Sequence, residues 1–144
     1  MPIYIDTSAL VKRYVLEQGS DDFDSFVLNC EDECIVSALG TTEFESMLQR
    51  LQRQGYIDAA FMQQARDHFM ADLATALWTV RPFENGSFVQ AVALMRSLEL
   101  PLATLDALHL ASAFDFGCDR FATGDKQLSR AAAKSGLTVH DFFT

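Results

Sequence analysis

Short apolar runs alternate along the chain with longer segments in which apolar residues recur every three or four positions. The short runs predict strands at residues 2–5, 34–37, 77–80, 120–123 and 137–139. The longer segments predict helices at residues 9–14, 19–30, 38–54, 84–99, 105–116 and 126–135, with one more that opens at 56–58 and reaches Leu73. Because strands alternate with helices, we expect an α/β fold, a three-layer α/β/α sandwich around a mainly parallel five-stranded sheet. No linker or repeat interrupts the pattern, so residues 1–144 are expected to form a single domain.

Several side chains mark where these helices begin and end. Asp6, Thr7 and Ser8 supply capping groups directly after the first predicted strand. Pro101 separates two later helices, since proline is costly inside a helix. Thr42 and Glu45 have the spacing of a capping box, which would make them part of a helix start.

Composition agrees with one helix-rich core. Of 144 residues, 49% are hydrophobic, and only 7 glycines and 3 prolines interrupt the segments. The longest uncharged stretch, residues 85–95, is shorter than the ~18 apolar residues of a membrane span, and the N-terminus lacks the pattern of a secretory signal. We therefore expect a cytosolic protein that does not cross a membrane. Its 3 cysteines, an odd number without zinc-site spacing, are expected to be free thiols.

The charge balance bears on the class of ligand. The chain has 20 acidic and 11 basic side chains, a net charge of −9, and most of the excess acid lies in residues 1–72. Such a balance argues against binding nucleic acid through lysine and arginine alone. Carboxylates that collect divalent cations are the exception, because the metal reverses the local sign of the field.

Four acids stand where an open parallel sheet presents its ligand site, beyond the carboxyl ends of the strands. Asp6 directly follows the first strand, and Asp125 follows the fourth through Gly124, whose lack of a side chain lets the backbone come close to a bound group. Glu43 and Asp106 lie early in the helices that begin near the same edge. We expect the four carboxylates to converge on one crevice.

Converging carboxylates repel one another, so such a cluster needs either a cation or protonation. Ligands made only of oxygen favour Mg²⁺ or Mn²⁺ over zinc. One or two such ions activate a water and neutralise charge on a phosphodiester, which predicts hydrolysis of a phosphate ester. Taken singly, each acid also has a structural explanation: Asp6 as a helix cap, Glu43 and Asp106 as first-turn acids, and Asp125 as a turn residue.

Four motifs carry a family resemblance that covers essentially the whole chain. They are Tyr4-Ile-Asp-Thr-Ser-Ala-Leu10, Glu43 within Thr-Thr-Glu-Phe, Leu105-Asp-Ala-Leu-His-Leu-Ala111, and Phe121-Ala-Thr-Gly-Asp125. In order and interval they resemble the motifs of PIN-domain nucleases, and most of all those of VapC-type toxin ribonucleases of toxin–antitoxin systems.

The resemblance implies a PIN-like fold and a Mg²⁺- or Mn²⁺-dependent endoribonuclease. Asp6, Glu43, Asp106 and Asp125 would form the acidic centre that binds the metal and carries catalysis. The hydroxyls of Ser8 and Thr123 would position these groups. Proteins of this kind commonly form homodimers, and a small antitoxin inhibits them by laying its C-terminal segment across the acidic groove.

A few further side chains are candidates for supporting roles. Basic residues near the four acids are candidate RNA contacts, namely Lys12, Arg13, Arg50 and Lys126. His109, three residues after Asp106, either orients that carboxylate by a hydrogen bond or is a half-buried structural histidine, and the second is the favoured interpretation.

Other activities fit the sequence less well. A haloacid-type phosphatase needs a second aspartate at position 8, which is Ser8, and a receiver domain needs an aspartate after the third strand, where Arg81-Pro82 stands. Two alternatives stay open. One is an RNA-processing nuclease without an antitoxin, and the other is a non-catalytic PIN-like binding module.

Overall fold

A computed structural model describes residues 1–143, so Thr144, the last residue of the expected 1–144 domain, lies outside the described residues. Five strands form one sheet: β1 (Ile3–Ile5), β2 (Cys34–Ser37), β3 (Thr79–Arg81), β4 (Arg120–Thr123) and β5 (Thr138–Asp141). Their order is β3-β2-β1-β4-β5, and every neighbouring pair is parallel. The predicted sheet is confirmed, and it is parallel throughout.

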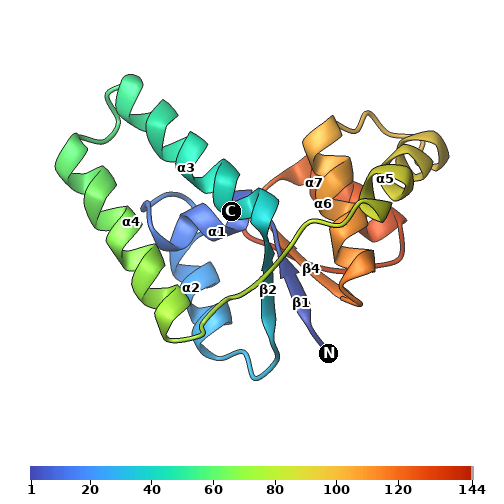
Figure 1. The fold of residues 1–144 in the computed structure, drawn as a ribbon, viewed down its shortest axis with the longest axis horizontal. Coiled ribbons are helices and arrows are strands. Elements are labelled where there is room, and N and C mark those ends of the chain that lie inside the picture. The colour runs from blue at the N-terminus through green and yellow to red at the C-terminus, as the bar shows by residue number, and fades with distance from the viewer. Residues whose placement is uncertain (144) are drawn as a thin grey trace.

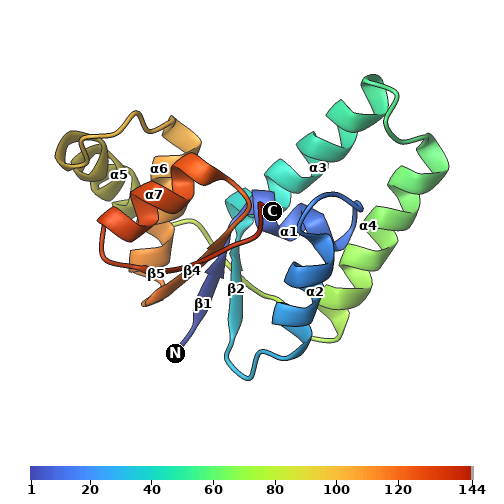
Figure 2. The ribbon, with the colours of Figure 1, turned by 180° about the vertical axis from the view of Figure 1, so that it is seen from behind.

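Helices cover both faces of this sheet. They are α1 (Thr7–Leu10), the 3₁₀ helix η1 (Val11–Arg13), α2 (Ser20–Leu28), α3 (Ala38–Arg53), α4 (Ala59–Ala74), α5 (Gly86–Ser97), α6 (Thr104–Asp115) and α7 (Lys126–Lys134). Helices α1 to α4 lie on one side and α5 to α7 on the other (Figures 1 and 2). The predicted three-layer sandwich is therefore confirmed. No helix within residues 1–143 is long and apolar enough to span a membrane.

The alternation of side chains along β1 divides the core in two. Ile3 and Ile5 pack with α1 to α4, whereas Tyr4, between them, packs with α5 to α7. All three are fully buried. This is the pattern of a central strand covered on both faces.

The third strand begins later than its sequence predicts. The apolar run at 77–80 includes Trp78, but β3 covers only Thr79–Arg81. Trp78 instead turns into the helical core, where it is buried and its Nε1–H donates to the hydroxyl of Tyr14 at 2.6 Å. Periodicity alone does not reveal that this tryptophan finds a partner outside the sheet.

The predicted capping box at Thr42 and Glu45 is wrong. Helix α3 begins earlier, capped by Ser37, whose Oγ accepts the Gly40 N–H at 3.1 Å. Glu45 pairs instead with Arg66 of α4, at 2.7 Å. Glu43 therefore lies in the second turn of α3, further from the helix start than a capping box would place it.

The direction in which successive strands are added to the sheet reverses between β1 and β4, which makes this a topological switch point. The chain runs from β1 outward through β2 to β3, then returns to the other side of β1 for β4 and β5. Loops that leave β1 and β4 at their carboxyl ends consequently turn toward opposite faces of the sheet, and a crevice opens between them.

A buried ion pair joins α4 to the segment after β1. Asp72 accepts hydrogen bonds from Arg13 Nε at 2.7 Å and from the Tyr14 hydroxyl at 2.6 Å. Burial would raise the pKa of Asp72, but the hydrogen bonds from Arg13 and Tyr14 outweigh it, and the pKa is lowered. The hydrophobic pattern of α4 gave no sign of a buried acid at this position.

We expect Asp72→Asn to destabilise the protein by about 3 kcal/mol at pH 7, because it leaves the largely buried Arg13 with only the more exposed Asp24 as a counter-charge. Since the folded pKa of Asp72 lies below its ordinary value, this stabilisation is present above about pH 4 and is lost as the pH falls through the folded pKa. Urea unfolding of both proteins at several pH values measures it. Asp24→Asn removes the more exposed partner of Arg13 and serves as the control, with an expected loss below about 1 kcal/mol. Equal losses in the two variants would contradict the prediction.

Candidate functional site

All four predicted acids line one pocket of about 190 Å³ at the carboxyl ends of β1 and β4. Asp6 follows β1, Glu43 comes from α3, Asp106 from the first turn of α6, and Asp125 from the residue before α7. The remaining lining residues are Thr7, Ser8, Met47, Arg50 and His109. Four segments far apart in sequence thus meet as predicted from their positions after the strands.

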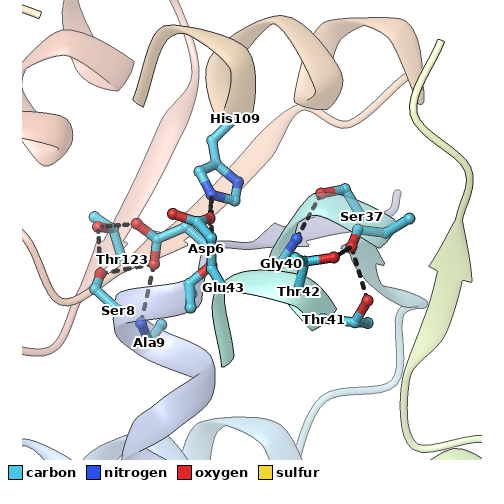
Figure 3. A network of polar contacts seen from close by, with 12 residues as sticks. Asp6, Ser8, Ala9, Ser37, Gly40, Thr41, Thr42, Glu43, His109 and Thr123 are labelled. Atoms are coloured by element: carbon cyan, nitrogen blue, oxygen red, sulfur yellow. Dashed lines mark hydrogen bonds and ion pairs between the residues drawn. The ribbon is translucent and has the colours of Figure 1, made fainter. Parts of the chain in front are cut away.

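Asp6 is the most firmly held of the four. Its Oδ1 accepts the Ala9 N–H at 2.9 Å and the Ser8 hydroxyl at 2.8 Å, and its Oδ2 accepts the Thr123 hydroxyl at 2.7 Å (Figure 3). The structural explanation of Asp6 as a helix cap is therefore correct, and it coexists with a place in the pocket. Burial raises the pKa of Asp6 above its usual range.

Ser8 and Thr123, the predicted positioning residues, also tie two loops together. The Gly124 N–H donates to Ser8 Oγ at 2.8 Å, and the Asp125 N–H donates to Thr123 Oγ1 at 3.0 Å. The loop after β4 is thus bound to the loop after β1 through the two hydroxyls that also hold Asp6. Asp125 caps α7 through the Leu128 N–H at 2.8 Å.

Gly124 packs closely against its own chain. The sequence suggested that its missing side chain lets the backbone approach a bound group. In the structure the close neighbours are within the chain, because a Cβ at Gly124 would stand 3.0 Å from the carbonyl oxygen of Ser8 and 2.5 Å from Lys12 Cε. Glycine is needed there so that the loop after β4 can pack against α1.

Glu43 is held from two elements. Its Oε1 accepts the Thr7 hydroxyl at 2.8 Å and contacts Nε2 of His109, which is almost fully buried (Figure 3). Burial would raise the pKa of Glu43, but the contacts with His109 and Thr7 outweigh it, and the pKa is lowered. His109 therefore contacts Glu43 and not Asp106, and it is more deeply buried than the half-buried residue we expected.

The sequence assigned Thr7 only to helix capping and gave no role in the site to Tyr4 beyond its place in a motif. Thr7 directly follows Asp6, and Tyr4 lies within the apolar run of β1, where it resembles a core residue. The Tyr4 hydroxyl contacts His109 Nδ1 at 2.5 Å. Only the fold reveals that contact, since the two residues are 105 positions apart.

The other acids of the pocket disfavour the ionised form of Asp106. Within residues 1–143 its carboxylate has no hydrogen-bond partner. Partial burial, together with the negative charges of Asp125 and Asp6, raises its pKa to about 6. The pocket therefore carries negative charge that its own hydrogen bonds do not offset.

The donor set fits a hard divalent cation. In residues 1–143 no three carboxylate, imidazole or thiol groups stand close enough together to hold an ion as they are. However, Asp106 and one oxygen each of Glu43 and Asp125 are free of internal hydrogen bonds, and all are oxygen donors, as Mg²⁺ and Mn²⁺ prefer.

Of the predicted RNA contacts, Arg50 alone lines the pocket. Lys12 is buried and donates to the Gln18 carbonyl at 2.7 Å, and Arg13 pairs with Asp72. Lys126 is exposed, with its Nζ over the ring of Phe143. The structure brings the acids together but leaves a single basic side chain beside them.

We expect Asp106→Asn to stabilise the metal-free protein at alkaline pH. Because the folded pKa of Asp106, about 6, exceeds the ordinary value of an aspartate, the folded wild type loses stability as the pH rises from about 4 through 6. The variant carries no charge at this position and so avoids the loss of stability. It should be more stable than the wild type by about 1 kcal/mol at pH 8, a value that allows for the partial exposure of Asp106. At pH 4 it should be no more stable than the wild type. Urea unfolding in EDTA measures the difference. A gain that is the same at both pH values would contradict the electrostatic cause.

Comparison with known proteins agrees with this architecture. No curated protein matches the chain by sequence. Among solved structures, it is similar to FitAcB from Neisseria gonorrhoeae, with a TM-score of 0.73 at 14% identity over 98% of both chains. It is also similar to VapC20 from Mycobacterium tuberculosis, a sarcin-ricin loop cleaving toxin, with a TM-score of 0.68 at 17% identity over 90% of this chain and 94% of that one. A third is DNA-bound VapBC from Salmonella typhimurium, with a TM-score of 0.67 at 12% identity over 99% of this chain and 98% of that one.

At these identities the structural matches establish the fold. The sequence model of the PIN domain matches residues 3–134, a range that includes the four acids of the pocket and the strands β1 to β4. The chain therefore belongs to the PIN domain family.

Proposed function

We propose that this protein is a metal-dependent endoribonuclease, the toxin component of a type II toxin–antitoxin system. The observation that carries the proposal is the convergence of Asp6, Glu43, Asp106 and Asp125 on one pocket at the switch point of the sheet. A fold gains nothing in stability by gathering four like charges, and the raised pKa of Asp106 reflects that cost. A requirement for a cation explains why the chain keeps them together.

Asp6, Glu43, Asp106 and Asp125 would hold Mg²⁺ or Mn²⁺, with Asp125 completing the set directly or through water. Such an ion lowers the pKa of a bound water and neutralises charge on a phosphodiester, the chemistry that hydrolysis of RNA requires. The chain's own contribution is to hold the acids in place. Ser8 and Thr123 restrain Asp6, while Thr7 and His109 restrain Glu43.

Arg50 supplies the positive charge on the rim. It extends from α3 two turns beyond Glu43 and lines the same pocket. A guanidinium there can bind a phosphate of the substrate backbone next to the acids. Because the pocket holds few bases, the substrate depends on the cation as well as on Arg50 for binding.

The structural relatives support a protein partner. One of them is a VapBC complex bound to DNA, so this chain is proposed to act with a small antitoxin. A homodimer is also proposed, supported by exposed apolar side chains on α5, where Phe88 is 55% exposed and Val89 75%. A nuclease of this kind would work on cellular RNA in the cytoplasm.

The two alternatives are weaker. A non-catalytic binding module has no need of four acids in one pocket, and all four are present. An RNA-processing nuclease without an antitoxin shares the same site chemistry. A gene for a small DNA-binding protein next to this one would separate the toxin from the processing enzyme.

We expect the purified protein to cleave structured RNA in Mg²⁺ or Mn²⁺, and EDTA to abolish cleavage. Asp106→Asn should lower the cleavage rate by about 100-fold or more, because it removes a charged oxygen donor that has no other partner. Asp67→Asn, an exposed acid on α4 that bonds only to Gln63, is the matched control and should cleave at the wild-type rate. Metal-independent cleavage, or full activity in Asp106→Asn, would refute the proposed chemistry.

Arg50→Gln should weaken substrate binding by about tenfold with a smaller effect on the rate at saturating RNA, since it removes one charge-assisted contact to phosphate. Arg53→Gln provides the comparison, because Arg53 is an exposed base one turn further along α3 and outside the pocket. Titration of cleavage rate against RNA concentration distinguishes the two variants. If both behave alike, general surface charge and not Arg50 attracts the substrate.

A further inference from the structure

A set of buried polar side chains adjoins the acidic pocket and extends from it into the core. Tyr4 of β1, Ser37 at the end of β2 and His109 of α6 are nearly or fully buried. Burying polar groups is costly unless they bond to one another, and these do. Of the three, only His109 lines the pocket, and it contacts the acid Glu43 there.

His109 is held at both ring nitrogens. Its Nε2 contacts Glu43 Oε1, and its Nδ1 lies 2.5 Å from the hydroxyl of Tyr4. Because a carboxylate can only accept, Nε2 is the nitrogen that donates its proton to Glu43. With contacts on both sides, the imidazole cannot turn without losing one of them.

Tyr4 in turn is immobile. Its ring stacks on Phe121 with centroids 5.3 Å apart, and on Phe116 at 6.2 Å. Its hydroxyl also lies 3.2 Å from Ser37 Oγ, and Ser37 caps α3, the helix that carries Glu43. The start of α3 and the side chain of Glu43 are therefore tied, directly and through His109, to the same tyrosine on the central strand.

These contacts use only one of the two oxygens of Glu43. His109 and the Thr7 hydroxyl both bind Oε1, and no hydrogen bond from the described chain reaches Oε2. We propose that His109, supported by Tyr4, is a positioning residue that holds Glu43 by Oε1 so that Oε2 stays available to a divalent cation in the pocket. This inference rests on the proposed function, in which the pocket binds that cation.

The same contacts keep the imidazole away from a metal. Histidine is a common ligand of zinc and other transition metals through a free ring nitrogen. Both nitrogens of His109 are engaged, although the residue lines the pocket. The donor set left to an ion is then oxygen alone, which favours Mg²⁺ and Mn²⁺.

Calorimetric titration of metal-free protein with Mn²⁺ tests the proposal. His109→Leu removes both polar contacts, and it should weaken Mn²⁺ binding by about 10- to 100-fold. His109→Gln keeps an N–H donor near the position of Nε2 and should stay within about threefold of the wild type. Tyr4→Phe leaves the ring stacking but not the hydroxyl, and it should weaken binding by about three- to tenfold. His68→Gln, a change to the partly exposed histidine of α4, is the matched control and should bind as the wild type does.

Thermal unfolding of each variant separates positioning from a purely structural role, which would lower Tm without changing the affinity for Mn²⁺. If His109→Leu does not fold, Tyr4→Phe and His109→Gln decide the matter, because they preserve most of the packing. Wild-type Mn²⁺ affinity in all folded variants would overturn the positioning role while leaving the proposed function intact. Failure of the wild type itself to bind Mn²⁺ would instead overturn the proposed function, and this inference with it.

Discussion

Mutual repulsion among four carboxylates at one edge of the sheet is the constraint that the surrounding structure has to satisfy. Three hydrogen bonds stabilise the carboxylate of Asp6, and contacts with Thr7 and His109 stabilise that of Glu43. The carboxylate of Asp106 accepts no hydrogen bond from residues 1–143, and its pKa rises to about 6. The groups that hold Asp6 and Glu43 come from α1, α6 and the end of β4, so the charged edge constrains how these elements meet.

The two halves of the site are supported in different ways. Asp6 and Asp125 belong to loops that Ser8, Thr123 and Gly124 join by short hydrogen bonds and close backbone packing. Glu43 sits on the second turn of a long helix, α3, whose cap at Ser37 lies beside the Tyr4 hydroxyl. One half thus depends on loops tied to each other, and the other on a helix tied to the core of the sheet. Family membership and fold are established, whereas the chemistry of the site is our proposal.

The fold and the positions of the four acids could be predicted because both follow from patterns within short stretches of the sequence. Strand runs, helix periods and the position of an acid after a strand are visible within a few residues, and β2 and β4 have the predicted bounds. Contacts between distant residues could not be predicted in this way. The bond between Tyr4 and His109, the pairing of Arg13 with Asp72 and the turn of Trp78 into the core each join residues more than 50 positions apart. Hydrophobic periodicity classes Tyr4 and Trp78 as apolar and contains no information about where their polar atoms lie.

The order of the strands also has a consequence for synthesis of the chain. Asp6 is translated before Thr123, which holds its Oδ2 and lies 117 positions later in the chain, on the strand next to β1. At about 5–20 residues per second, roughly 6 to 25 seconds separate the two. Until then the chain lacks Asp125, β4 and the hydroxyl that binds Asp6 Oδ2. The pocket that Asp6, Glu43, Asp106 and Asp125 line can therefore form only after residue 125 has been translated.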